Sequence, residues 1–168
     1  ITTPYGKIFH TGDWKLDEQP VIGIPSTAEQ LTAIGDSGIL ALVCDSTNAF
    51  NADDSGSEGS VKADLLKSVK AAKGRVLLTT FASNAARLQT MGEVARETGR
   101  TLCFAGRSLH RIIEAAQANG YLKDMPKTVD MEAVDGLARH DVMVVATGGQ
   151  GEARAALARI AEGNHPVK

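Results

Sequence analysis

The sequence predicts an α/β domain in which a parallel sheet carries helices on both faces. Apolar segments with the composition of strands alternate with segments of helical spacing, an order that favours right-handed crossover connections. The apolar segments are 6–11, 39–45, 75–80, 101–105 and 141–147. The last four are continuous and rich in Leu and β-branched residues, which is typical of parallel strands buried on both faces.

The helices are expected between these strands, at 27–34, 57–72, 84–98, 108–119 and 152–162. Hydroxyl side chains stand where helices would begin, so Ser26 or Thr27, Ser57 and Ser83 are the predicted N-caps. Glycines stand where helices would end, at positions 74, 99 and 120.

The composition fits one ordinary globular domain, since 43% of the 168 residues are hydrophobic. Cys44 and Cys103 both lie in apolar runs and are expected to be buried free thiols in strands, which is compatible with a cytoplasmic setting. No apolar run approaches the roughly 18 residues that cross a bilayer. The first residue is Ile1 and no leader follows it, so the chain is expected to begin inside a longer product.

Charge is distributed unevenly along the chain. Residues 1–58 carry two basic and nine acidic side chains, whereas residues 59–117 carry ten basic and four acidic ones. A basic middle beside an acidic start suits a polyanion near a metal-binding edge. For the lysines at 62, 67, 70 and 73, a solvated outer helix face is the simpler interpretation, with a polyanion-binding surface as the alternative.

Each of the four predicted buried strands is followed by a loop of small or hydroxyl residues, and these loops read DSTNA, TFASNAAR, AGRS and TGGQGE. Ligands of parallel sheets bind beyond the carboxyl ends of the strands, where backbone N–H groups of helix N-termini favour anions. Arg87 and Arg107 add guanidinium groups that bind phosphate oxygens. One such loop alone is more simply a helix cap, but four together favour an anion-binding groove. No GxxxxGK[ST] or GxGxxG motif is present.

Six segments in order carry a resemblance to a known family: IFHTGDWKLD, LVCDSTNA, GSE, TTFASN, GRS and TGGQGEARAALARIA. From Tyr5 to about His165 the chain resembles the ribonuclease J family, metallo-β-lactamase-fold nucleases with an inserted β-CASP domain. The resemblance implies a partial metallo-β-lactamase segment at 1–45 and a β-CASP domain at 46–168. Ala86, Gly149 and Ala153 depart from the family pattern, in which His, Ser and Pro are common at these positions.

The resemblance also implies roles for individual residues. Asp13, in Thr-Gly-Asp, corresponds to the carboxylate that bridges two zinc ions and is thus both a catalytic residue and a metal ligand. Asp45, in Asp-Ser-Thr, corresponds to a catalytic signature acid that orients a histidine. The residues expected to face the RNA are Ser57, Glu58, Ser83, Asn84, Arg87, Arg107, Ser108, Gly148, Gln150, Gly151 and Glu152. The four histidines show no ligand spacing and are expected to be structural.

The implied function is that of a zinc-dependent ribonuclease of RNA processing and decay, acting as a 5′–3′ exonuclease and endonuclease through a metal-activated hydroxide. The other zinc ligands of the family would lie outside this sequence, so the chain alone is expected neither to hold a zinc pair nor to cleave RNA. RNA, a second copy of the longer protein and RNA-degradation proteins are the implied partners, in the cytoplasm. Two alternatives remain, namely a nucleic-acid or partner binding module without chemistry and a DNA-processing β-CASP nuclease.

Overall fold

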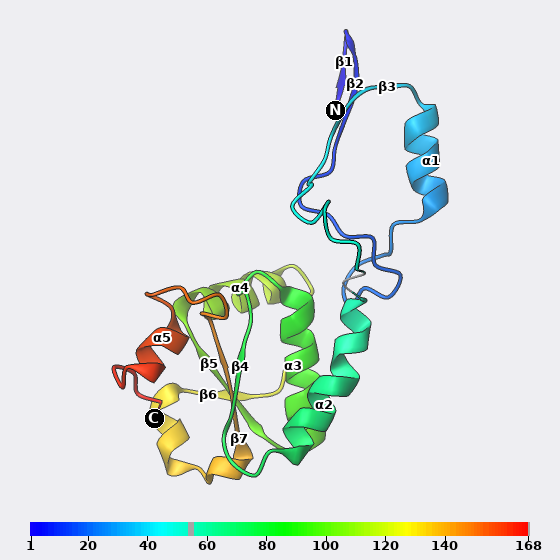
Figure 1. Ribbon diagram of the computed structural model, residues 1–168. Helices are drawn as coiled ribbons and strands as arrows, with labels where there is room; N and C mark the ends of the chain where they lie inside the picture. Colours follow the sequence, from blue (N-terminus) through cyan, green and yellow to red (C-terminus); the bar gives the residue numbers. More distant parts are fainter. Residues whose placement is uncertain (54–55, 168) are drawn as a thin grey trace. The chain divides into compact units, whose positions relative to one another are not determined.

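The computed structural model describes residues 1–53 and 56–167. The chain divides into two compact units, Ile1–Ser57 and a second unit that starts at Glu58, and each is described by itself (Figure 1). This division concerns compactness alone. The assignment of 1–45 to a metallo-β-lactamase segment and of 46–168 to a β-CASP domain therefore stays a prediction.

The first unit contains a three-stranded sheet in the order β1-β2-β3 and one helix. Strand β1 (Thr2–Thr3) pairs antiparallel with β2 (Gly6–His10), and β2 pairs parallel with β3 (Ile39–Val43). Helix α1 (Ala28–Asp36) connects β2 to β3. Thr27 caps α1 in a reciprocal capping box with Gln30, which confirms the predicted cap.

The first unit has no buried side chain among its described residues. The prediction that 39–45 is a strand buried on both faces is therefore wrong, because β3 is the edge strand of this small sheet and Leu40 is 70% exposed. The expectation of a buried thiol at Cys44 is wrong for the same reason, whereas Cys103 is buried and free in β5. Burial raises the pKa of the Cys103 thiol to about 11, so the group stays protonated and inert.

The second unit is built on a four-stranded, all-parallel sheet in the order β4-β7-β5-β6. Its strands are β4 (Val76–Thr79), β5 (Thr101–Ala105), β6 (Thr128–Val129) and β7 (Val142–Ala146). The helices of this unit are η1 (Glu58–Ser60), α2 (Val61–Ala71), α3 (Ala85–Thr98), α4 (Arg107–Ala118), η2 (Met131–Gly136), η3 (Arg139–Asp141) and α5 (Ala156–Ala161). The last strand in the chain, β7, thus lies between β4 and β5 at the centre of the sheet.

Both faces of this sheet are covered at β5 and β7, as their continuous apolar runs predict. For 75–80 the prediction of a strand buried on both faces is wrong, because β4 lies at the edge of the sheet and Leu77 is 39% exposed. One face presents alternate residues of β5 and β7, including Cys103 and Val144, to a core that also contains Val134 of η2 and Ala156 of α5. The intervening residues are also fully or almost fully buried and lie on the face served by α3 and α4. Figure 1 shows α2 and α3 side by side, with α5 on the other side of the sheet. An α/β sheet with helices on both faces is confirmed.

Three predicted helix starts need correction. Asn84 caps α3 by accepting from the backbone N–H of Arg87, so the cap is one residue later than the predicted Ser83. Ser57 is not the N-cap of α2, because α2 begins at Val61 and Ser60 holds the N-cap position; the Ser57 hydroxyl donates to Asp17 Oδ1 at 2.6 Å. Helix α5 starts at Ala156 rather than at 152, because the backbone of Ala155, at the N-cap position, is extended (φ −75°, ψ 164°).

Candidate functional site

The two acids predicted to be catalytic follow the carboxyl ends of neighbouring parallel strands in the first unit. The backbone N–H of Thr11, just after β2, donates to Val43 O at 3.0 Å. The N–H of Asp45 donates to Thr11 Oγ1 at 3.3 Å, which ties the segment after β3 to the segment after β2. Asp13 follows β2 by a few residues and is exposed. Both carboxylates therefore stand at the same end of the same strand pair.

The Asp45 carboxylate is held by its own turn. Its Oδ1 accepts hydrogen bonds from the Thr47 hydroxyl at 2.6 Å and from the Thr47 backbone N–H at 2.9 Å. These hydrogen bonds hold the pKa of Asp45 below its ordinary value. A carboxylate fixed in this way is suited to accept a further hydrogen bond from a neighbouring group, as the predicted orienting role requires.

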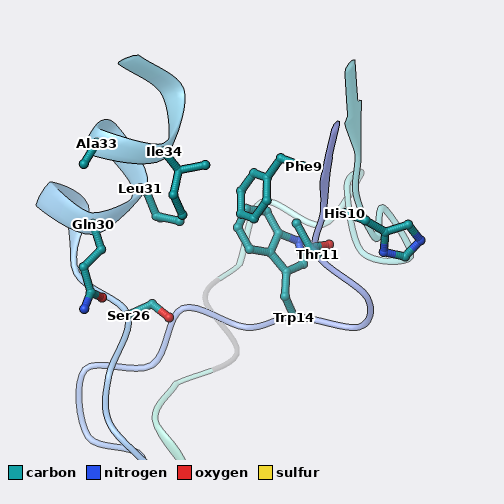
Figure 2. Close-up of a pocket in the computed structure, with 9 residues that line it drawn as sticks. All are labelled: Phe9, His10, Thr11, Trp14, Ser26, Gln30, Leu31, Ala33 and Ile34. Carbon is teal, nitrogen blue, oxygen red and sulfur yellow. The ribbon is translucent and has the colours of Figure 1, made fainter. Parts of the chain in front are cut away.

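The residues near Asp13 do not form a zinc site by themselves. Among the described residues, no three His, Cys, Asp or Glu side chains lie together as metal ligands. A hollow of about 610 Å³ between β2 and α1 is mainly apolar in its lining. Figure 2 shows Phe9 and Trp14 on one side of this hollow and Leu31 and Ile34 of α1 on the other. Such side chains do not fit a zinc pair, which takes imidazole and carboxylate ligands.

Three of the four predicted loops meet at one edge of the second unit's sheet. The loops TFASNAAR, AGRS and TGGQGE follow the parallel strands β4, β5 and β7, which are adjacent in the sheet. The fourth loop, DSTNA, follows β3 and belongs to the first unit. A groove built from four loops of a single sheet is therefore wrong, because β3 pairs with β2 in another sheet.

A cavity of about 390 Å³ lies at the carboxyl ends of β4 and β7, and we call it the β4–β7 cavity. It is lined by Thr79, Thr80, Phe81, Asn84, Arg87, Gly149 and Gln150. Three of the predicted RNA-facing residues are among these, namely Asn84, Arg87 and Gln150. Phe81 was not predicted, although its side chain is 53% exposed in this lining. An exposed aromatic ring beside polar groups is a surface on which a nucleobase can stack.

Arg87 and Glu58, both predicted to face RNA, instead bind one another. Arg87 Nε donates to Glu58 Oε1, and Arg87 Nη2 donates to Glu58 Oε2 at 3.0 Å. This bidentate pair raises the pKa of Arg87 and leaves its positive charge compensated within the protein. The pair joins η1 to α3, so its first contribution is to the structure of the cavity wall.

The loop after β7 is organised by its own backbone. The N–H of Gln150 donates to Glu152 Oε2 at 2.9 Å, and the N–H of Gly151 donates to Gly148 O at 3.2 Å. Gly149 approaches β4 so closely that a Cβ atom there would lie 3.1 Å from Thr79 Oγ1. The loop therefore presents Gln150 to the β4–β7 cavity in a defined position.

The remaining predicted RNA-facing residues lie elsewhere. Ser57 is in the first unit, where its hydroxyl contacts Asp17 and Gln19 O. Ser83 is exposed in the turn before α3. Arg107 and Ser108 begin α4 and line another cavity, which shares no residue with the β4–β7 cavity. The lysines at 67 and 70 are exposed on α2, in agreement with a solvated helix face, and Lys73 is exposed beyond its end. For Lys62 that interpretation is wrong, because its Nζ forms ion pairs with Glu93 at 2.7 Å and Glu97 at 2.8 Å of α3.

Comparison with known proteins gives a consistent result. The family described as ribonuclease J, beta-CASP domain, matches residues 73–167. Ribonuclease J of Sinorhizobium meliloti is 40% identical over 96% of this chain and 28% of its own length. Ribonuclease J of Corynebacterium glutamicum is 43% identical over 98% of this chain and 23% of its own length. Ribonuclease J 1 of Streptococcus pyogenes is 42% identical over 98% of this chain and 30% of its own length.

The chain thus spans less than a third of the length of these relatives. The matches include both compact units, and the family match lies within the second of them. In the described part of the chain, none of the helices has the length and apolar character needed to span a membrane. The motifs, the parallel sheet and these matches together lead to one conclusion: the chain belongs to the ribonuclease J β-CASP domain family.

Proposed function

We propose that this chain is a segment of a zinc-dependent ribonuclease that hydrolyses RNA phosphodiesters in RNA processing and decay. The observation that carries the proposal is the family match over residues 73–167 together with relatives named ribonuclease J. The longer protein acts from the 5′ end and internally, in the cytoplasm, and as an oligomer of identical subunits with RNA-degradation proteins as further partners. Each of these finer statements is part of the proposal.

In this proposal, the second unit holds the RNA while other parts of the longer protein complete the metal site. Asp13 is the zinc ligand from this chain, and Asp45 orients a histidine that lies outside this sequence. The position of both acids just after the carboxyl ends of β2 and β3, joined by the hydrogen bond from the Asp45 N–H to Thr11 Oγ1, supports a shared role at one site. The isolated chain then binds RNA without cleaving it, which is also what the binding-module alternative expects of it.

The role of Asp13 is tested in the longer protein by Asp13→Asn. We expect RNA cleavage to fall by roughly a hundredfold or more, because even second-shell substitutions at metal sites cost about 10–100-fold. The measurements are cleavage of end-labelled RNA, the zinc content of the purified protein, and RNA affinity, which should be unchanged. Full cleavage by the variant would remove the metal-ligand role, and equal cleavage of single-stranded DNA by the unsubstituted protein would favour the DNA-processing alternative.

The RNA-binding role of the β4–β7 cavity is tested in this chain by Phe81→Ala. Loss of base stacking costs about 1–3 kcal/mol, so we expect the Kd for a single-stranded RNA to rise roughly 5- to 150-fold. Fluorescence anisotropy with a labelled oligonucleotide measures the change. Tyr121→Ala is the matched control, because Tyr121 is another exposed aromatic residue, 48% exposed and outside this cavity. Equal affinities of the two variants would exclude stacking on Phe81.

A further inference from the structure

A second cavity, of about 510 Å³, lies beyond the carboxyl ends of β5 and β7. Four arginines line it: Arg107 and Arg111 come from α4, and Arg154 and Arg159 come from the chain after β7. We call it the arginine cavity. Of the described residues that form its lining, none is an Asp or a Glu. The charged side chains of this lining are therefore all cationic, and they stand beside neutral polar groups such as Ser108 and Thr147.

The described residues supply no ion-pair partner to these arginines, although Glu132 acts electrostatically on His165 in the same lining. In the described part of the chain, the ion pairs involve other basic residues and none of these four arginines. Arg159 Nη2 donates to Asn164 O at 3.3 Å, a neutral acceptor. Like charges held around one cavity repel one another, and a bound anion relieves that repulsion. Guanidinium groups bind phosphate oxygens with two parallel hydrogen bonds, which makes phosphate a suitable anion.

A buried histidine supplies an independent observation. His165 is only 6% exposed and lines the same cavity. Its Nδ1 accepts the backbone N–H of Val167 at 3.2 Å. Burial, with a contribution from Arg159, lowers the pKa of His165, so its ring is neutral at neutral pH and its single proton is on Nε2. Among the described residues this Nε2–H has no hydrogen-bond acceptor, and it is not one of their fully buried unpaired atoms, so it is open to a ligand in the cavity that His165 lines.

The backbone at the cavity also suits an anion. Helix α4 has twelve residues and begins at Arg107, so its N-terminal N–H groups lie at the cavity together with the Ser108 side chain. Gly106 has a φ of 140°, and a Cβ atom there would lie 3.0 Å from Thr147 Oγ1. The close approach of β5 and β7 at this point places the start of α4 beside the chain that carries Arg154.

We propose that the arginine cavity is a phosphate-binding subsite, in which the guanidinium groups and the His165 Nε2–H bind the oxygens of one phosphate group. We take the source of that phosphate to be an RNA chain held at the sheet edge. This part of the inference rests on the proposed function. A free small phosphate compound is the other source of the same chemistry. The β4–β7 cavity and the arginine cavity lie on either side of the loop that follows β7, so one RNA strand along this edge would meet both.

The test uses the whole chain with Arg111→Ala and Arg154→Ala combined. Both residues are exposed, so the substitutions should leave the fold intact. The control combines Lys67→Ala and Lys70→Ala, which removes the same charge from α2. Inorganic pyrophosphate is titrated by calorimetry, and single-stranded RNA with a 5′-phosphate or a 5′-hydroxyl is titrated by fluorescence anisotropy. We expect the arginine variant to bind pyrophosphate and RNA about tenfold more weakly or worse, and the lysine control to change less than about twofold.

The RNA arms identify the source of the phosphate. An equal loss for both RNAs indicates a backbone phosphate, a loss confined to the 5′-phosphorylated RNA indicates a terminal phosphate, and a loss for pyrophosphate alone indicates a free phosphate compound. Equal affinities of the arginine variant and the lysine control for all three probes would overturn the subsite. If RNA binding then persisted and still depended on Phe81, the proposed function would stand without the subsite. If pyrophosphate bound but RNA did not, the phosphate-binding subsite would stand without the proposed function.

Discussion

Replacing Arg100 with leucine is expected to lower the free energy of unfolding by about 3–5 kcal/mol. Arg100 is 8% exposed, and its guanidinium donates to four backbone carbonyls. Nη1 reaches Gly74 O at 2.8 Å and Val142 O at 3.2 Å, while Nη2 reaches Ala72 O at 2.6 Å and Val69 O at 3.4 Å. Leucine would leave these carbonyls without their donors in a buried place. Chemical denaturation monitored by circular dichroism measures the loss.

The position of Arg100 explains the expected size of this effect. Val69 is in the last turn of α2 and Ala72 is its C-cap, and the carbonyls at this end carry the negative end of the helix dipole. Arg100→Lys keeps the charge but not the forked geometry, so an intermediate loss is expected. Arg139→Leu is the control, since Arg139 is exposed. A loss from Arg100→Leu no larger than that from Arg139→Leu would mean that these hydrogen bonds contribute little.

The apolar runs of the sequence predicted most of the fold because their signal is local. Continuous runs at 75–80, 101–105 and 141–147 became strands β4, β5 and β7 with helices on both faces. The strand order was not predictable, since β7 enters between β4 and β5 through pairing of residues far apart in the chain. The prediction that the run at 39–45 is buried on both faces was wrong for a related reason. Its composition is that of a buried strand, but burial depends on packing partners, and the described residues of the first unit leave Leu40 70% exposed.

The candidate site was predicted only as far as its motifs extend. Loop motifs led to Asn84, Gln150 and Arg107, which do line the two cavities at the sheet edge. The Arg87–Glu58 pair was missed because its members are 29 residues apart and carry no shared pattern. The four arginines of the arginine cavity were missed as a group because they come from α4, the loop after β7 and α5. Counting charges along the sequence does not show that these separate segments meet at one cavity.

Gly148→Ala is expected to destabilise the second unit by about 2–4 kcal/mol and to weaken RNA and pyrophosphate binding together. Gly148 has a φ of 116°, a conformation that costs L residues about 1–3 kcal/mol. A Cβ atom there would also lie 2.8 Å from the Ala155 Cβ and 2.9 Å from the Leu157 Cβ, so the start of α5 must move. That movement would displace Gln150 at one cavity and Arg154 at the other. Thermal denaturation and both binding assays measure these effects.

Gly151→Ala is the control that separates backbone strain from crowding. Gly151 has a φ of 78° in the same loop, but no heavy atom lies within 4 Å of a Cβ built there. We expect a loss of about 1 kcal/mol from the left-handed backbone alone, with little change in pyrophosphate binding. If the two variants were equally stable, the contacts at Ala155 and Leu157 would be unimportant. If Gly148→Ala lost RNA binding but kept pyrophosphate binding, the loop would position the β4–β7 cavity without positioning the arginine cavity.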